Sequence, residues 1–336
     1  MTAVKLGSGR EFDLIRQILQ NGNADPSLLR VGPGDDAAVL SRSGRVVSCD
    51  LSVEDVHFRR DWLAPGEVGY RATMAALSDL AAMGAEPLAV LASLAGTAED
   101  AESGVLTEVG LGTRRAALEV GACLAGGDVT RSSGPLVVDV MVVGDTETPV
   151  LRSGARPGDE VWVTGVLGGA AGAVRLWKEG VSPGEDLRAR FARPTPRFGV
   201  MDSLRETGLL TAGMDLSDGL AGDAGHIAAA SAVELRLLLS SIPVDPALEE
   251  ALGVDEAREV ALAGGEDYEL LVTARPGLHR WVQGIQEAHG VELTRVGTVE
   301  SGSGVRILDA QGRERDARVG SFEHFQSKQP TSPDFR

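Results

Sequence analysis

The spacing of apolar and polar positions predicts an alternation of strands and helices in the first half of the chain. Apolar residues recur with helical spacing over residues 11–20, 65–84 and 99–121. Strand-like runs occupy "AAVL", "RVVSCD", "PLAVLASLA" and "PLVVDVMVVGD", and the turn "SRSG" separates the first two. This half is therefore predicted to mix helices with strands.

A segment rich in glycine, proline and charge, "TETPVLRSGARPGD", predicts a domain boundary near its middle. Beyond it, strands are expected at "EVWVTG", "VELRLLLS", "DYELLVTA" and "VELTRVGTV", and helices at about 169–178 and 197–207. The expected fold class is α+β, a mixed α/β arrangement in two domains. We place these domains at residues 1–149 and 150–326, and we expect a loose polar tail at 327–336.

Composition narrows the class of protein. The chain has 336 residues and a formal net charge of −17, which argues against nucleic acid and against an anionic membrane surface as partners. Two cysteines form no disulfide framework, and the first residues lack the apolar core of a signal peptide. The apolar run "PLAVLASLAGTA" is too short to span a bilayer as a helix. A cytoplasmic location is therefore expected.

Acidic residues recur at predicted strand ends and beside glycines. They are Asp35 and Asp36 in "GPGDDAAVL", Asp50, Asp79, Asp128 in "LAGGDVTR", Asp215 and Asp218 in "MDLSDGLAGDAGH", and Glu266 and Asp267 in "LAGGEDYELL". Taken singly, each aspartate is more often a turn or helix-cap residue. Asp79 differs, because it is the one charge in the apolar helical segment "ATMAALSDLAAMGA", where an unpaired carboxylate costs several kcal/mol to bury.

Together the acidic residues predict one convergent site that requires a positive charge. Carboxylate oxygens without cysteine or paired histidine favour Mg²⁺ before Ca²⁺, and Mg²⁺ held in this way commonly also binds a substrate phosphate. The sequence carries neither a P-loop nor a kinase catalytic loop. From the residues alone, His57 is interpreted as structural and Arg152 as a solvated linker charge.

Seven segments in one order carry a family resemblance: "GPGDDAAVL", "LSDLAAMGAEP", "GGDVTR", "RSGARPGD", "MDLSDGLAGDAGHI", "AGGEDYEL" and "SFEHF". From about residue 10 to about residue 325 the chain resembles the thiamine-monophosphate kinase family, within the aminoimidazole-ribonucleotide-synthetase-like ATP-binding superfamily. The resemblance implies transfer of the γ-phosphoryl group of ATP to thiamine phosphate, several Mg²⁺ ions, and a homodimer. It also implies that the N-terminal domains of two chains pair into a β-barrel-like core.

The same resemblance assigns roles by motif position. It implies that the metal ligands are Asp36, Ser48, Cys49, Asp50, Asp79, Asp128, Asp215 and Asp218, with Cys49 standing where the family usually has Thr. It implies ATP contacts from Gly127, Asp128, Arg152 and Ser217, and thiamine phosphate contacts from His57, Glu266 and Phe322. The acceptor is already an oxyanion, so no single catalytic residue is assigned, and positioning with electrostatic stabilisation is expected to carry the reaction.

Two alternatives to this kinase hypothesis stay open. One is another ATP-dependent enzyme of the superfamily: a ligase of purine synthesis, a selenophosphate synthetase or a carbamoyl-dehydrating maturation factor. Residues 1–30 contain no reactive cysteine and the chain ends in "PDFR", which argues against the last two. The other is a non-catalytic Mg²⁺- or nucleotide-sensing module, which would bind ATP without turnover.

Overall fold

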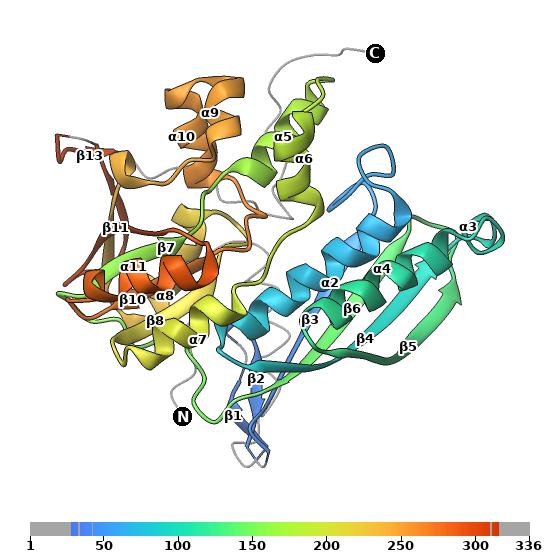
Figure 1. Cartoon of the computed structure of the whole chain (residues 1–336), viewed down its shortest axis with the longest axis horizontal. Coiled ribbons are helices and arrows are strands. Elements are labelled where there is room, and N and C mark those ends of the chain that lie inside the picture. The colour runs from blue at the N-terminus through green and yellow to red at the C-terminus, as the bar shows by residue number, and fades with distance from the viewer. Residues whose placement is uncertain (1–27, 33, 42, 310, 316–336) are drawn as a thin grey trace.

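The computed structural model describes residues 28–32, 34–41, 43–309 and 311–315, which form two β-sheets with helices packed around them (Figure 1). The strands are β1 (Leu29–Val31), β2 (Ala38–Leu40), β3 (Arg45–Val53), β4 (Glu86–Gly96), β5 (Cys123–Arg131), β6 (Val137–Asp145), β7 (Glu160–Thr164), β8 (Leu210–Asp215), β9 (Glu234–Leu238), β10 (Leu270–Ala274), β11 (Leu293–Glu300), β12 (Gly304–Leu308) and β13 (Glu314–Arg315). The helices are α2 (Pro65–Ala82), α3 (Ala98–Glu102), α4 (Val105–Glu119), α5 (Gly169–Lys178), α6 (Gly184–Ala192), α7 (Phe198–Glu206), α8 (Leu220–Ser231), α9 (Pro246–Leu252), α10 (Val254–Ala263) and α11 (His279–His289), with a short 3₁₀ turn at Leu239–Ser241.

The first sheet has the strand order β1-β2-β3-β6-β4-β5 and is antiparallel except where β4 pairs with β5. Helices α2 and α4 lie together over one face of it (Figure 1). Their backbones approach closely at two glycines: a Cβ added to Gly69 would lie 1.9 Å from the carbonyl oxygen of Val109, and one on Gly112 would lie 2.0 Å from that of Gly66. Glycine at both positions therefore permits this helix packing.

The second sheet has the order β13-β12-β9-β11-β7-β10-β8, antiparallel except for the pair β9 and β12. Helix α2 also contacts β8, α6 and α7, so this one helix is packed between the two sheets. Most of α2 is apolar and buried, from Val68 to Ala82, as expected for a helix enclosed on several sides. The polar side chains that α2 does carry are therefore placed at the junction of the two halves of the molecule.

The strand and helix predictions hold for most of the first half, with two corrections. The expected helix over 99–121 is two helices, because the chain breaks at Gly104, which has φ +85°. The Gly-Gly-Asp segment, for which the sequence pattern predicts no strand, lies inside strand β5, where a Cβ added to Gly127 would lie 1.8 Å from the carbonyl oxygen of Ala92 in β4. Gly127 therefore marks a close contact between these two strands.

The second half contains several elements that the pattern does not predict, namely β8, β12, β13, α6 and α8 to α11. Strand β10 begins at Leu270, so "DYE" precedes the strand that was expected to include it. The expected helix over 11–20, Phe322 and the tail 327–336 lie outside the described residues. Within the described part, none of the helices has both the length and the apolar character needed to cross a membrane.

Candidate metal centre

Three carboxylates from distant parts of the sequence meet beside α2. Asp36 precedes β2, Asp79 lies in the last turn of α2, and Asp215 ends β8. One oxygen of each lies within 4.8 Å of the others. The first sheet, its covering helix and the second sheet thus each contribute one acidic side chain to a single point, as the convergent site predicted from the sequence requires.

Two further aspartates border this point. Asp50 in β3 faces the α2 side of the sheet, because it pairs with the buried residue Val140. Its charge acts on Asp79 and Asp215, and Asp218 in turn acts on Asp50. We call the set Asp36, Asp50, Asp79, Asp215 and Asp218 the acidic basin. Ser48, two residues before Asp50, donates a hydrogen bond of 2.5 Å to Oδ2 of Asp79.

The acidic basin holds its carboxyl groups in a setting that disfavours their charge. Burial, reinforced by Asp36, raises the pKa of Asp215 to about 7, and burial reinforced by Glu266 raises the pKa of Asp50 to about 6. The pKa of Asp79 is raised well above its usual value by burial and by Asp50. A cation bound among these groups would lower their pKa values again. It would also relieve the repulsion between the charged carboxylates of the basin.

The donor set fits a hard divalent cation. Oδ2 of Asp36 is buried and has no hydrogen-bond partner in the described structure, and such an orphaned oxygen is costly unless something binds it. Its neighbours Asp79 and Asp215 are also oxygen donors, and Ser48 adds a hydroxyl. Carboxylate and hydroxyl oxygens without thiolate ligands are the donors that Mg²⁺ prefers.

Arg152 is the cation that the chain itself places at the basin. Its Nε donates to Oδ1 of Asp36 at 2.9 Å, its Nη2 donates to the same oxygen, and the Asp36 side chain is fully buried. The backbone N–H of Arg152 donates to Asp35, whose pKa is raised to about 7 by burial and by Asp36. Arg152 is only 17 % exposed, so its interpretation as a solvated linker charge is wrong.

A second group of possible ligands lies next to the basin: Asp218, Asp223 and His226. Asp223 is buried in α8, and its Oδ2 accepts the backbone N–H groups of Asp218 and Gly219, each at 3.1 Å. Gly219 has φ +104°, a conformation that other residues rarely adopt. Asp223 therefore fixes the turn that presents Asp218 to the basin.

Glu266 and Ser217 lie together at the edge of the basin. The backbone N–H of Glu266 donates to the carbonyl oxygen of Ser217 at 2.9 Å, and the Glu266 charge is the strongest acidic influence on Asp50. The Glu266 side chain is 28 % exposed and is paired with Arg71. Ser217 and Glu266, to which the resemblance assigned substrate contacts, thus lie next to residues to which it assigned metal binding.

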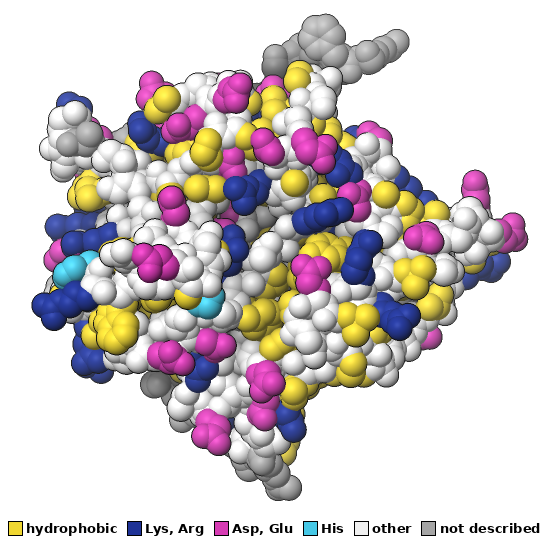
Figure 2. Space-filling model, in the orientation of Figure 1, with side chains coloured by type: hydrophobic (Ala, Val, Ile, Leu, Met, Phe, Trp, Pro, Cys, Tyr) yellow, Lys and Arg dark blue, Asp and Glu magenta, His cyan; other side chains and the backbone are white. Residues whose placement is uncertain are grey.

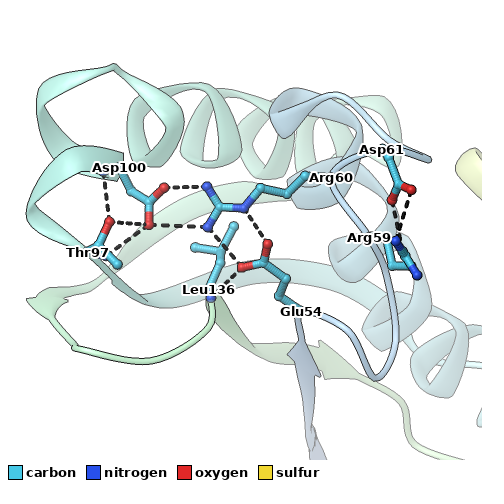
Figure 3. A network of polar contacts seen from close by, with 7 residues as sticks. All are labelled: Glu54, Arg59, Arg60, Asp61, Thr97, Asp100 and Leu136. Atoms are coloured by element: carbon cyan, nitrogen blue, oxygen red, sulfur yellow. Dashed lines mark hydrogen bonds and ion pairs between the residues drawn. The ribbon is translucent and has the colours of Figure 1, made fainter. Parts of the chain in front are cut away.

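His57 lies on the loop that follows β3, and a polar network braces that loop (Figure 3). Its Nδ1 accepts the N–H of Val53 at 3.1 Å. Arg60 bridges Glu54, at 2.5 Å from Nε to Oε1, and Asp100, while Glu54 also accepts the N–H of Leu136 at 2.9 Å. The network ties the loop to α3 and to the start of β6, so the backbone that carries His57 is anchored at both sides.

Three assigned residues are not brought to the basin within this chain. Cys49 pairs with Met141 on the opposite face of the first sheet, so its side chain points away from Asp79. Gly127 and Asp128 lie on β5, which β4 and β6 separate from β3. Asp128 is exposed and lies on the same face as Cys49. The metal and ATP roles of these three residues stay predictions.

Sequence reasoning missed the residues that support the site, above all Arg71 and Tyr268. Arg71 is buried in α2, and its signal in the sequence is that it stands eight residues before Asp79 in an otherwise apolar segment. Two opposite charges in one buried helix indicate partners on other elements. For Asp223 the signal is its place in the acid- and glycine-rich segment that also contains Asp218.

The stability of the metal-free protein is expected to rise as the pH falls from 8 to 6. Asp35, Asp50 and Asp215 have folded pKa values of about 7, 6 and 7, above the unfolded value of about 3.9. Raised carboxyl pKa values contribute stability at low pH that is lost as the pH rises through them. His226 has the opposite effect on the pH dependence of stability, because burial lowers its pKa to about 4. It is a single group, so the three carboxylates outweigh it.

Thermal melting of the metal-free protein at both pH values measures the effect. We expect a melting temperature higher by roughly 5 °C at pH 6, and a stabilisation by Mg²⁺ that is larger at pH 8, where the carboxylates are charged. Sodium chloride at equal ionic strength is the control for general screening. Equal stabilisation by Mg²⁺ at both pH values, or none at all, would contradict the assignment of a cation site.

Comparison with known proteins identifies the protein family to which the chain belongs. Residues 34–146 match the family described as AIR synthase related protein, N-terminal domain, and residues 156–309 match the corresponding C-terminal domain. A thiamine-monophosphate kinase of Mycobacterium tuberculosis is 38 % identical over 271 residues, covering 78 % of this chain and 79 % of the relative. That of Escherichia coli K12 is 35 % identical over 298 residues, covering 85 % and 89 %.

A solved structure described as AaThiL complexed with AMPPCP and TMP superimposes with a TM-score of 0.79 at 31 % identity, covering 97 % of this chain and 99 % of that one. The two-sheet fold and the matched domains define an AIR synthase related protein. Within that class, the identity over most of the length shows that the chain belongs to the thiamine-monophosphate kinase family.

Proposed function

We propose that the protein is an Mg²⁺-dependent kinase that transfers the γ-phosphoryl group of ATP to thiamine phosphate, giving thiamine diphosphate and ADP. The observation that carries the proposal is the convergence of Asp36, Asp79 and Asp215 on one point, with a buried Asp36 oxygen that lacks a partner. The relatives named as thiamine-monophosphate kinases, and the related complex with AMPPCP and TMP, support the choice of substrates.

The chain's own residues suit a reaction between two phosphate groups. Bound Mg²⁺ would neutralise charge on both donor and acceptor, which is the main barrier to their in-line approach. Asp36, Asp50, Asp79, Asp215 and Asp218 would hold the metal ions. Arg152 would orient a phosphate group of ATP, and the packing of α2 against the first sheet keeps the carboxylates fixed before the substrates arrive.

The other residues assigned by resemblance are proposed to contact the two substrates. Glu266, partly exposed beside Asp50, and His57, on its braced loop, would contact thiamine phosphate, together with Phe322. Ser217, Gly127 and Asp128 would contact ATP. The acceptor oxygen is an anion already, so no side chain has to remove a proton from it, and we assign no general base.

The direct test is incubation of the purified protein with Mg²⁺, ATP and thiamine phosphate, with product identification by chromatography and mass spectrometry. Thiamine diphosphate and ADP in equal amounts are expected. Thiamine and inorganic phosphate serve as separate acceptor controls. ATP binding without turnover on thiamine phosphate would reject the proposal in favour of a nucleotide-binding module, and turnover only with another acceptor would indicate a different enzyme of the class.

We also propose that the protein is a homodimer formed through the first sheet. The face opposite α2 exposes apolar side chains: Leu51 is 55 % exposed and Met141 is 41 % exposed. Exposed apolar side chains gathered on one sheet face are typical of an interaction surface. On the face drawn in Figure 2, acidic and basic side chains are interspersed with apolar ones.

A charged substitution on the open face is expected to produce monomers. Met141→Glu places a carboxylate opposite Cys49 and near Asp139, which would oppose burial of this face against a second chain. Light scattering coupled to size exclusion should give the mass of two chains for the original protein and of one chain for the variant. Trp281→Glu, which also replaces an exposed apolar side chain by a carboxylate but lies on α11, is the control. A monomeric original protein, or a dimeric Met141→Glu variant, would contradict the proposal.

Two further expectations stay proposals. We place the boundary between the two domains near residue 150, in the segment that links the two sheets, and we propose that the enzyme works in the cytoplasm. A stable fragment ending near this boundary after limited proteolysis would support the first, and fractionation of the source cells addresses the second.

A further inference from the structure

The segment Gly264–Tyr268, between α10 and β10, is held in an unusual backbone conformation. Two of the four non-glycine residues with positive φ in the described part of the chain are Glu266, at +74°, and Tyr268, at +51°. Such conformations are unfavourable for residues other than glycine and persist only where the surroundings enforce them. The strain marks a place where the direction of a side chain matters more than local stability.

Backbone contacts show what enforces this conformation. The N–H of Glu266 donates to the carbonyl oxygen of Ser217 at 2.9 Å, and the N–H of Tyr268 donates to that of Leu216 at 2.8 Å. A Cβ on Gly265 would lie 2.1 Å from the Ser217 oxygen, so only glycine fits between them. The segment is therefore tied to the chain between Asp215 and Asp218, directly beside the acidic basin.

Two donors converge on one oxygen of Glu266. The Tyr268 hydroxyl donates to Oε2 at 2.8 Å, and Nη2 of Arg71 donates to the same oxygen. Burial and the charge of Glu266 raise the pKa of Tyr268 well above its usual value, so its hydroxyl remains a donor. Both donors are buried, whereas the Glu266 side chain is 28 % exposed.

Arg71 is itself fixed by contacts with Phe191 of α6. Its Nε donates to the carbonyl oxygen of Phe191 at 2.9 Å, and its guanidinium carbon lies 4.1 Å from the centre of the Phe191 ring. Phe191 packs edge-on against Trp62 and Trp177, whose rings are stacked at 5.0 Å. The aromatic cluster thus holds the guanidinium in one orientation, and a lysine could not reproduce its contacts.

We propose that Tyr268 and Arg71 are positioning residues that fix the Glu266 carboxylate at the edge of the acidic basin, so that its exposed side receives the organic part of the acceptor substrate. This inference rests on the proposed function. A carboxylate suits the cationic, hydrogen-bond-donating ring system of thiamine phosphate. Because the two donors occupy Oε2 from the buried side, the carboxylate is oriented before the substrate binds, which reduces the entropy lost on binding.

The chain offers a matched pair of variants for the test, because it has only two tyrosines. Tyr268→Phe removes the hydroxyl that contacts Glu266. Tyr70→Phe removes a hydroxyl of α2 that contacts Glu119 of α4, at 3.1 Å. Steady-state kinetics of both variants, with thiamine phosphate and ATP varied in turn, and thermal melting of each are the measurements.

For Tyr268→Phe we expect the KM for thiamine phosphate to rise about tenfold, with kcat and the KM for ATP changed less than about twofold. Tyr70→Phe should leave all three constants unchanged. In a Glu266→Gln background, Tyr268→Phe should add little, because Tyr268 acts through the Glu266 carboxylate. A merely structural role would instead lower the melting temperature and affect both substrates alike.

Several results would overturn the proposal. A KM for thiamine phosphate unchanged by Tyr268→Phe would do so, as would fully additive effects with Glu266→Gln. If Tyr268→Phe does not fold, Arg71→Lys is measured in its place, with the same expected rise confined to thiamine phosphate. An original protein that makes no thiamine diphosphate would reject the proposed function and this inference together, whereas an active original protein with an unaffected Tyr268→Phe variant would reject the inference alone.

Discussion

Asp79→Asn is expected to lower the rate of phosphoryl transfer on the order of 100-fold or more without unfolding the protein. On α2, Asp79 accepts a hydrogen bond from Ser48 of the first sheet, and its carboxylate lies close to that of Asp215 of the second sheet. The amide is nearly isosteric, and its carbonyl oxygen can still accept the Ser48 hydrogen bond. What the substitution removes is one negative charge from a site that we propose holds metal ions by charge.

The same substitution is expected to stabilise the metal-free protein. Burial and Asp50 raise the pKa of Asp79 well above its usual value, so its ionised form destabilises the fold near neutral pH. A neutral amide relieves that repulsion, and the melting temperature without Mg²⁺ should therefore increase at pH 8. The stabilisation that Mg²⁺ produces should shrink at the same time, because one ligand is lost.

Activity and melting with and without Mg²⁺ measure both effects on one preparation. Asp202→Asn, on the exposed side of α7 with its side chain 65 % exposed, is the control and should change neither quantity appreciably. Full activity in Asp79→Asn would contradict its assignment as a metal ligand. A large loss of stability would show instead that the carboxylate has a structural role.

The part of the site that the sequence predicts is the part whose signal is local. Asp79 stands out because it is the one charge in the segment "ATMAALSDLAAMGA", Asp36 because it follows a Gly-Pro-Gly turn, and Asp215 because it lies in a segment rich in acidic residues and glycines. Those signals depend on residues within one element. The apolar pattern predicts β3, β4 and β6 in the same way, because each of these strands packs one face against α2.

The parts that the sequence does not predict depend on pairs from distant elements. Arg152 and Asp36 are 116 residues apart, and nothing in the linker composition around Arg152 indicates that its guanidinium is buried. Strand β5 is not predicted, because Gly-Gly is uncommon inside a strand, while here Gly127 permits close packing against β4. The second half contains helices as short as seven residues, too short to show a clear period.

Arg152→Gln is expected to impair the protein in two separable ways. In the metal-free state it leaves the fully buried Asp36 side chain without its cation, which should lower the free energy of unfolding by about 3 to 5 kcal/mol at pH 8. The deficit should be smaller at pH 6, because Asp36, whose pKa burial already raises, can then take up a proton. In the assembled enzyme the variant should also raise the KM for ATP at least about tenfold, by removing the proposed phosphate contact.

Mg²⁺ distinguishes the two roles. A bound cation supplies the countercharge that Asp36 loses, so saturating Mg²⁺ should recover much of the lost stability, while the higher KM for ATP should remain. Arg152→Lys keeps the charge without the two-nitrogen contact to Asp36 Oδ1. Its stability should lie between those of the original protein and of Arg152→Gln. Arg175→Gln, which breaks exposed ion pairs with Glu179 and Glu256, is the control and should cost less than about 1 kcal/mol. If Mg²⁺ fails to restore stability to Arg152→Gln, Arg152 and the metal do not neutralise the same carboxylate, and the acidic basin does not bind cations as proposed.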